Sequence, residues 1–455
     1  MQREYNTFIQ RKEKSIMKTE INRIAAKAIK NRKEVFTSLA HHITLELLWD
    51  SLRKIPLQSS VGVDNQDVKR AKEEFSIWSV EIISALHRRR YRPPPLRRTY
   101  IPKIGKAQKR PISIPTIVDR VLQKAVVEVL NAIYEKDFLD CSFGGRPKRS
   151  AHQALATLHK AIIARKVSWI YEADLKNFFG SLDQEWIERF VTHRIQDPRI
   201  LTLIKRWLKA GVLEEGEIQQ TPQGIPQGGP ISVLLSNIYL HYVLDLWIEK
   251  VMKPKMRGEV YYVRYLDDFV VCFQYHSDAL LLQQEISKRL GKFSLELEAS
   301  KTRLIEFGRF ADRDAKAKRE KVKVLYFLGF QLYCSKSHNG NFKIGVKTEK
   351  TRLRTIHLKI TTLLRKIRHR PLCEQEKAIN SVLRGHYQYY GVGGNFNTLY
   401  CLYRFTERYW HKALSSRSQK GYLNWIKYRK ILEKFPLKKP SLSMPYSRMN
   451  QLAKL

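Results

Sequence analysis

The stretch VYYVRYLDDFVVCF, residues 260–273, carries two adjacent aspartates, Asp267 and Asp268, inside a run that otherwise has the composition of a buried strand. Apolar and aromatic residues flank the pair on both sides, so the pattern predicts two apolar strands joined at a turn that holds the carboxylates. Burial of ionised carboxylates is costly because they lose their hydration. The pair therefore needs a compensating charge, and a bound cation is the obvious source.

The charge balance of the whole chain indicates a polyanionic partner. The 455 residues include 84 Lys and Arg against 43 Asp and Glu, a formal net charge of +41, and 43% are hydrophobic, enough for substantial cores. Such an excess of positive charge concentrates phosphate backbones at the protein surface. An anionic membrane is the rival partner, but the basic residues are spread along the chain instead of gathered on one amphipathic helix. The sequence predicts a nucleic-acid partner and no membrane.

Other signals place the chain in a reducing compartment. Its five cysteines lie at positions 141, 272, 334, 373 and 401, with no spacing typical of a zinc knuckle or a disulfide framework. The first twenty residues lack the apolar core of a signal peptide. There is no Walker-type phosphate loop and no HExxH motif, and the glycine cluster GVGGN is in the wrong context for dinucleotide binding, so hydrolase and dehydrogenase functions have no support. We expect a cytoplasmic protein that associates with nucleic acid.

The remaining patterns predict mixed α and β elements. Helices are expected over 20–54 and 66–90, followed by a boundary at prolines 93–95. After that boundary we expect a basic β-hairpin over 97–115, a helix over 116–135, a strand over 168–175 that leads into a helix over 176–191, a Gly/Pro/Gln turn over 222–230 that opens a helix over 231–251, a strand over 324–334, and basic helices from there to the end.

A third carboxylate belongs with the pair. Asp174 comes at the end of its expected strand, so two strands laid side by side would bring it to the sheet edge that carries Asp267 and Asp268. Three carboxylates there suit two Mg²⁺ ions about 3.5–4 Å apart, the arrangement that nucleotidyl transfer often uses. Two structural alternatives stay open: Asp174 could cap the following helix, and the pair could form an ordinary polar turn.

The motifs around YLDD add a resemblance. YLDD (265–268) resembles the Tyr-x-Asp-Asp signature of reverse transcriptases, and its surroundings resemble the group II intron-type reverse transcriptase/maturases over about residues 20–430. The supporting motifs, in the family's order, are KRPISIPTIVDRVLQKAV, SFGGRPKRSAHQAL, YEADLKNFFGSLD, IPQGGPIS, LEASKTRLIEF and YFLGF, with VLRGHYQYYGVGGN resembling the thumb and maturase region.

The resemblance implies an α+β right-hand polymerase. Residues 1–90 would form an N-terminal helical extension of the fingers, 91–340 the fingers and a palm with an antiparallel sheet, and 341–455 a helical thumb and maturase-like RNA-binding region. The implied cofactor is a pair of Mg²⁺ ions, with Mn²⁺ as a substitute. The implied partners are dNTPs, a DNA or RNA primer, and an RNA template or intron RNA.

The resemblance also assigns residues. Asp174 and Asp267 would hold the metals with Asp268 beside them, although neighbouring strand residues point opposite ways, which could leave Asp268 behind the ligands. The nucleotide-binding residues would be Lys103, Lys109, Arg110, Phe179, Gln227, Gly228 and Lys301; the primer grip would be Phe327, Leu328, Gly329 and Phe330; and RNA would be bound by Arg384, His386, Tyr387, Tyr390 and Arg404. The alternatives are core packing for the aromatic residues and a solvated surface for the charged ones.

Four positions depart from the family pattern. The family usually has Ala where Leu266 stands, Phe where Gly145 stands, Asp where Gly180 stands and His where Gln184 stands. None removes a metal ligand, so we expect RNA-directed DNA polymerase activity to survive. The alternatives are an RNA-binding maturase with secondary polymerase activity, and a domesticated reverse transcriptase in defence or DNA repair. The C-terminus shows no Cys/His-bearing endonuclease segment, and DNA cleavage is not expected.

Overall fold

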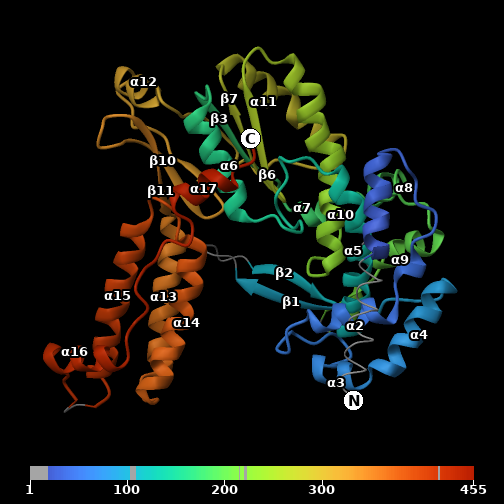
Figure 1. Ribbon diagram of the computed structural model, residues 1–455, viewed down its shortest axis with the longest axis horizontal. Coiled ribbons are helices and arrows are strands. Elements are labelled where there is room, and N and C mark those ends of the chain that lie inside the picture. Colours follow the sequence, from blue (N-terminus) through green and yellow to red (C-terminus); the bar gives the residue numbers. More distant parts are fainter. Residues whose placement is uncertain (1–18, 103–108, 215, 220–222, 419–420) are drawn as a thin grey trace.

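The structure is a computed structural model that describes residues 19–102, 109–214, 216–219, 223–418 and 421–455. These residues form a mixed α and β structure in which helices surround small, mainly antiparallel sheets (Figure 1). The strand orders are β2-β1-β4-β5, β6-β7-β3-β8 and β11-β10-β9. Lys103, the first of the expected phosphate-binding lysines, lies outside the described residues.

The N-terminal region is helical but more broken than the sequence predicted. Instead of one helix over 20–54, a helix over 19–30 is followed by an irregular segment whose Phe36 N–H donates to Arg194 O at 2.8 Å. The later helices start at side-chain caps on Thr44 and Asp67, which stop helix propagation from upstream. The elements here are η1 (Ala40–His42), α2 (Leu45–Arg53), α3 (Val68–Glu73) and α4 (Phe75–His87).

The expected basic hairpin is confirmed. β1 (Leu96–Pro102) and β2 (Lys109–Ile114) pair antiparallel, with Ile101 opposite Arg110. A short parallel contact joins β1 to β4 (Val212–Glu214), which pairs with β5 (Glu217–Gln219). The long helix α5 (Ile117–Asp137) follows β2 directly and packs in the centre of the largest core.

The central sheet is buried on both faces. In β3 (Trp169–Asp174), Ile170 points into one core whereas Tyr171 and Ala173 point into the other. The same alternation runs along β6 (Val260–Tyr265) and β7 (Asp268–Phe273), and β8 (Arg303–Glu306) completes the sheet. Because both faces are covered, an ionisable side chain in the middle of these strands is buried away from solvent. Only side chains at the strand ends can remain solvated.

Helices cover this sheet and link it to the N-terminal region. α6 (Ala151–Ala164) and α11 (His276–Gly291) pack on the central sheet. The other elements of this region are α7 (Phe178–Ser181), α8 (Gln184–Thr192), α9 (Pro198–Leu208), α10 (Pro230–Leu240), the π-helical η2 (His241–Asp245) and η3 (Ile248–Met252), η4 (Lys253–Lys255) and α12 (Ala311–Ala317). Together 230–255 are long and apolar enough to span a membrane, but 83% of the most apolar stretch is buried inside the protein, as in a core helix.

The C-terminal part begins with strands that the sequence analysis did not separate. β9 (Leu325–Phe327), β10 (Phe330–Lys336) and β11 (Phe342–Thr348) form one sheet, so the chain turns helical only after β11 and the predicted boundary at 340 divides a paired hairpin. The helices α13 (Lys350–Ile367), α14 (Leu372–Tyr390), α15 (Phe396–Ser415) and α16 (Trp425–Lys434) have a core of their own. α17 (Tyr446–Leu452) returns to pack beside α6 (Figure 1).

Candidate active site

Three aspartates meet at one edge of the central sheet. Asp174 ends β3 and is the antiparallel partner of Asp268, which begins β7 and also pairs with Tyr265 of β6. Asp267 occupies the two-residue turn between β6 and β7, after Leu266 in the left-handed conformation (φ 57°). Asp174 is no helix cap, because the caps of α7 and α8 are Asn177 and Asp183.

Burial and neighbouring negative charge raise the pKa of two of the three carboxylates, Asp267 and Asp268. Burial, and then the charge of Asp174, raises the pKa of Asp267 to about 6. Burial raises the pKa of Asp268 well above its usual range, with further increases from the charges of Asp174 and Asp267. The cluster thus holds more negative charge than its surroundings compensate, which is the electrostatic condition for binding cations.

Two basic side chains act electrostatically on the cluster, and one of them, Lys301, contacts it. Lys301 forms an ion pair with Asp174 Oδ2; burial alone would lower the pKa of Lys301, but this bond and the aspartate charges raise it overall. The charge of Arg110, on β2, lowers the pKa of Asp267, against the larger raising effects of burial and of Asp174. Both are residues that the sequence analysis assigned to nucleotide binding.

The metal assignment depends on donor chemistry. Within the described residues, no group of three or more His, Cys, Asp and Glu side chains is arranged to hold a metal ion as it stands. Asp174 instead faces Lys301. The donor set nevertheless fits Mg²⁺, which prefers carboxylate oxygens, and the raised pKa of Asp267 and Asp268 reflects their burial first and the charge of the neighbouring aspartates second.

The expected nucleotide-binding turn docks on the basic hairpin. Ser113 N of β2 donates to Gln227 O at 2.6 Å, and Gly228 has φ 135°. A β-carbon on Gly228 would lie 2.3 Å from Ser113 O, so only glycine allows this approach. Lys109 and Arg110 are exposed on the same strand. The turn and the hairpin therefore form one surface.

Phe179 joins that surface from the other side. Its backbone carbonyl accepts from Ile225 N at 2.7 Å, and its half-buried ring lies edge-on to Phe178, with centroids 5.3 Å apart. Part of the ring packs on the large core and part stays accessible. The position is compatible with both the packing alternative and contact with a sugar.

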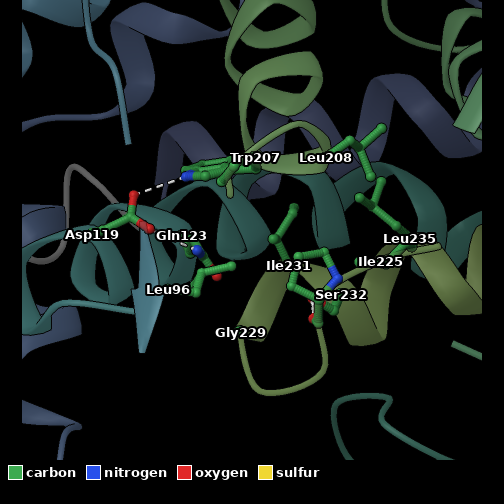
Figure 2. Close-up of a pocket in the computed structure, with 12 residues that line it drawn as sticks. Leu96, Asp119, Gln123, Trp207, Leu208, Ile225, Gly229, Ile231, Ser232 and Leu235 are labelled. Atoms are coloured by element: carbon green, nitrogen blue, oxygen red, sulfur yellow. Dashed lines mark hydrogen bonds between the residues drawn. The ribbon is translucent and has the colours of Figure 1, made fainter. Parts of the chain in front are cut away.

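A buried polar network supports the turn from behind (Figure 2). The Asp119 carboxylate accepts from Trp207 Nε1 at 2.8 Å, Tyr91 OH at 2.9 Å and Gln123 Nε2 at 2.9 Å. Gly229 lies against Gln123: a β-carbon there would be 2.4 Å from its Oε1. The cavity they line, about 10 Å³, has room for one water molecule and none for a nucleotide.

The YFLGF segment forms the tight turn between β9 and β10. Phe327 and Phe330 are buried in the core behind the sheet, as the packing alternative predicted, and leave Leu328 (φ 53°) and Gly329 (φ 78°) partly exposed. Tyr389 OH, which sequence analysis did not single out, donates to Leu328 O at 3.1 Å. Of the four residues assigned to the primer grip, only Leu328 and Gly329 are therefore exposed enough to contact a primer.

The five residues assigned to RNA do not form one surface. His386 (7% exposed) and Tyr387 (2% exposed) are buried, and Tyr387 belongs to the core of α13–α16, so neither ring offers a face for base stacking in this structure. Tyr390 is half-buried beside Phe330, with ring centroids 5.1 Å apart. Arg384 and Arg404 are exposed, the latter pairing with Glu407 at 2.6 Å. A heptad-like apolar pattern on α14 would have indicated the burial.

Arg264 and Asp245 also escaped the sequence analysis. They form a fully buried ion pair, at 2.5 Å, directly beneath the turn that carries Asp267. The available signal was a lone Arg inside the apolar strand VYYVRY and a lone Asp inside the apolar helix HYVLDLW. A single charged residue is unfavourable in an apolar segment. The ion pair between Arg264 and Asp245 explains why each segment contains one.

Comparison with known proteins agrees with this geometry. The reverse transcriptase (RNA-dependent DNA polymerase) family matches residues 101–332, about half of the chain. Protein YkfC of Escherichia coli is 28% identical over 70% of this chain and 84% of its own length. The group II intron-encoded protein LtrA of Lactococcus lactis is 35% identical over 50% of this chain, which spans 38% of LtrA. Nuclear intron maturase 3 of Arabidopsis thaliana is 25% identical over 39% of this chain and 27% of its own length. The chain belongs to the reverse transcriptase family of RNA-directed DNA polymerases, among its group II intron-type reverse transcriptase/maturases.

Proposed function

We propose that this chain extends a DNA or RNA primer with deoxynucleotides on an RNA template. The observation that carries the proposal is the cross-strand pair Asp174 and Asp268, with Asp267 in the adjoining turn, in a chain of the reverse transcriptase family. Burial and the charges of neighbouring aspartates raise the pKa of Asp267 and Asp268, and carboxylates perturbed in this way cluster at functional sites.

In this proposal Asp174 and Asp267 hold two Mg²⁺ ions, or Mn²⁺ in their place, and Asp268 supports them. When bound, the ions would lower the pKa of the attacking primer hydroxyl and stabilise the leaving oxygen. Lys301 lies against Asp174, where its ammonium can neutralise the departing pyrophosphate. Its raised pKa keeps it protonated for that task.

The substrate would lie across the surface formed by the hairpin, the turn and α7. Lys109 and Arg110, with Lys103, would contact the triphosphate, since exposed cations reach phosphate oxygens without a large desolvation cost. Phe179 would meet the sugar and disfavour a 2′-hydroxyl. Gln227 and Gly228 would position template and nucleotide, and Leu328 with Gly329 would touch the primer.

The proposed architecture is a right hand. The helices before residue 91 would extend the fingers, the central sheet would be the palm, and α13–α16 would be the thumb and the RNA-binding region. We move the palm–thumb boundary from 340 to the end of β11, because β10 and β11 pair along their whole length. We expect the protein to work in the cytosol with nucleic acid.

Primer extension on an RNA template tests the polymerase proposal. Wild-type protein with Mg²⁺ and dNTPs should extend the primer, and Asp267→Asn should reduce the rate by at least about a hundredfold, since it removes a proposed metal ligand. Asp312→Asn, on the exposed face of α12, is the matched control and should keep the wild-type rate. Equal rates for wild type and Asp267→Asn would refute the assignment.

A second function is favoured by the charge and by the separate core of the C-terminal helices. A basic helical unit that folds around its own core could bind intron RNA and assist splicing without polymerising. Splicing assistance should then persist in Asp267→Asn and fail in Arg384→Ala/Arg404→Ala. The opposite pattern would reject the maturase proposal. Intron RNA structure around the reading frame would separate either activity from a domesticated role.

A further inference from the structure

The guanidinium of Arg264 is completely buried three residues before Asp267, and all of its N–H groups are used. Nε and Nη2 donate to the two oxygens of Asp245 at 2.7 and 2.5 Å. Nη2 also donates to Ser142 Oγ at 2.8 Å. Nη1 donates to Asn237 Oδ1 at 3.0 Å and to Leu266 O at 3.1 Å. A planar fork with five donors matches this set of acceptors, and no other side chain does.

The bond to Leu266 O reaches the turn itself. Leu266 is in the left-handed conformation, a strained one for a non-glycine residue, so its carbonyl needs a partner to hold it. On the other side of the turn, Gly144 lies so close that a β-carbon there would be 2.5 Å from Leu266 N. Asn237 links the two sides, because its Nδ2 donates to Gly144 O at 2.8 Å. The turn before Asp267 is thus clamped from both directions.

Asp245 supplies the anchor for the clamp. It ends the π-helical segment η2, accepts from Tyr262 OH at 2.9 Å in addition to Arg264, and is itself completely buried. Arg289 donates to two carbonyls of the same segment, Val243 O at 2.9 Å and Tyr242 O at 3.1 Å, which secures the irregular helix. A helix held in this way can fix the position of Arg264 against the sheet.

We propose that Arg264, anchored by Asp245, is a positioning residue that holds the Leu266–Asp267 turn in the geometry required for nucleotidyl transfer. This inference rests on the polymerase function proposed above. A buried ion pair adds little net stability compared with apolar side chains of similar size, so stability alone does not account for the pair. What an apolar pair could not do is donate to Leu266 O.

Arg264→Lys tests the proposal. Lysine keeps the charge beside Asp245 but lacks the planar fork, so it cannot serve Leu266 O, Asn237 and Ser142 together. We expect kcat for dNTP incorporation to fall at least roughly tenfold, with the KM for dNTP changed by less than about threefold, because the turn is misplaced while the nucleotide surface is intact. Hydrogen exchange in the 265–269 segment should accelerate in the same variant.

The matched control is Arg194→Lys. Arg194 is a nearly buried arginine that pairs with Asp137 at 2.9 Å, away from the turn. It should lose a comparable amount of thermal stability while kcat and exchange over 265–269 stay at wild-type values. A loss of kcat in both variants would mean that general destabilisation, and not positioning, is responsible, and would overturn the proposal.

A second variant covers the case in which Arg264→Lys does not fold. Arg264→Met/Asp245→Leu/Tyr262→Phe removes the buried charges together with the hydroxyl that depended on them, which should restore folding. It should still show slow incorporation and fast exchange over 265–269. A folded variant with kcat within about twofold of wild type and unchanged exchange would overturn the proposal.

The exchange measurement separates this inference from the polymerase proposal. If wild-type protein does not extend a primer, the proposed function fails, and exchange over 265–269 in Arg264→Lys still decides whether Arg264 holds the turn. If wild type extends, Asp267→Asn does not, and Arg264→Lys matches wild type in rate and exchange, only the positioning role fails.

Discussion

Leu266 lies against Gly145, since a β-carbon built on Gly145 would be 3.3 Å from Leu266 Cδ2. These are two of the four positions at which the sequence departs from the family pattern, with a larger residue than usual at 266 and a smaller one at 145. The two positions are in contact, so the larger side chain at 266 lies beside a residue that has no side chain. The same β-carbon would be 2.2 Å from Val233 Cγ1, so the space beside the turn is already filled.

This packing predicts a stability loss on truncation. Leu266→Ala should lower the free energy of unfolding by about 1–2 kcal/mol, less than for a fully buried leucine because Leu266 is partly exposed. Leu266→Met, which conserves volume, should change it by under about 1 kcal/mol. Urea unfolding measures both. Leu358→Ala, at a leucine that is 67% exposed, is the control. A neutral Leu266→Ala would mean that the side chain does not pack there.

The raised pKa of Asp267 predicts that Asp267→Asn is more stable than the wild type, by an amount that depends on pH. Because the pKa of about 6 in the folded protein exceeds the ordinary value of 3.8, the folded state binds more protons between pH 4 and 6, and stability falls as pH rises through that window. Asp267→Asn removes this cost, so at pH 7.5 it should be more stable than wild type by about 1–3 kcal/mol, with a smaller difference at pH 4. Urea unfolding of both proteins at pH 7.5 and pH 4 measures this difference in stability. An equal difference at the two pH values would contradict a raised pKa for Asp267.

Divalent cations should reduce that difference in stability. Mg²⁺ binds the folded carboxylate cluster and not the unfolded chain, so it should raise the Tm of the wild type, by the equivalent of about 1.4 kcal/mol at ten times its Kd. Asp267→Asn should show little of this effect. Lys301→Met frees Asp174 from its ion pair and should increase the Tm gain at a given Mg²⁺ concentration. Sodium chloride at matched ionic strength is the control, and an equal gain from it would argue against a specific site.

RNA binding should distinguish exposed from buried residues of the C-terminal helices. Arg384→Ala/Arg404→Ala should weaken binding of single-stranded RNA and reduce the slope of log K against log salt by about 0.7 for each phosphate that the variant no longer neutralises. Burial lowers the pKa of His386 to about 4, so at pH 7 it is neutral and His386→Phe should leave the slope unchanged. Filter binding across a salt series tests both. A reduced slope in His386→Phe would show that the ring is reached by RNA.

The burial of His386 has a second consequence. Its pKa in the folded protein lies below the ordinary value, so the unfolded chain binds more protons, and stability is lost as pH falls from about 6.5 to 4. His386→Phe should remove part of that loss. Thermal unfolding at pH 7 and pH 5 measures it, and an unchanged acid sensitivity would mean that other buried groups dominate.

Local sequence patterns were enough to specify the separate parts of the site. Short continuous apolar runs on either side of the aspartate pair specify two strands and a turn, and the run ending at Asp174 specifies a third strand, because a strand buried on both faces is apolar at nearly every position. The basic hairpin, the helix after it and the glycines of the 224–229 turn were also readable from local patterns. The motif order, together with these elements, was sufficient to indicate the family.

Long-range packing determines which of these parts touch. The pairing of Asp174 with Asp268, the ion pair of Lys301 with Asp174, and the burial of His386 and Tyr387 depend on contacts between residues far apart in the chain, which no local pattern contains. Arg264 and Asp245 illustrate the reason most directly. Each is unfavourable in its own apolar segment, and only the packing of a π-helical segment against a strand turns two isolated charges into a clamp beneath the turn that carries Asp267.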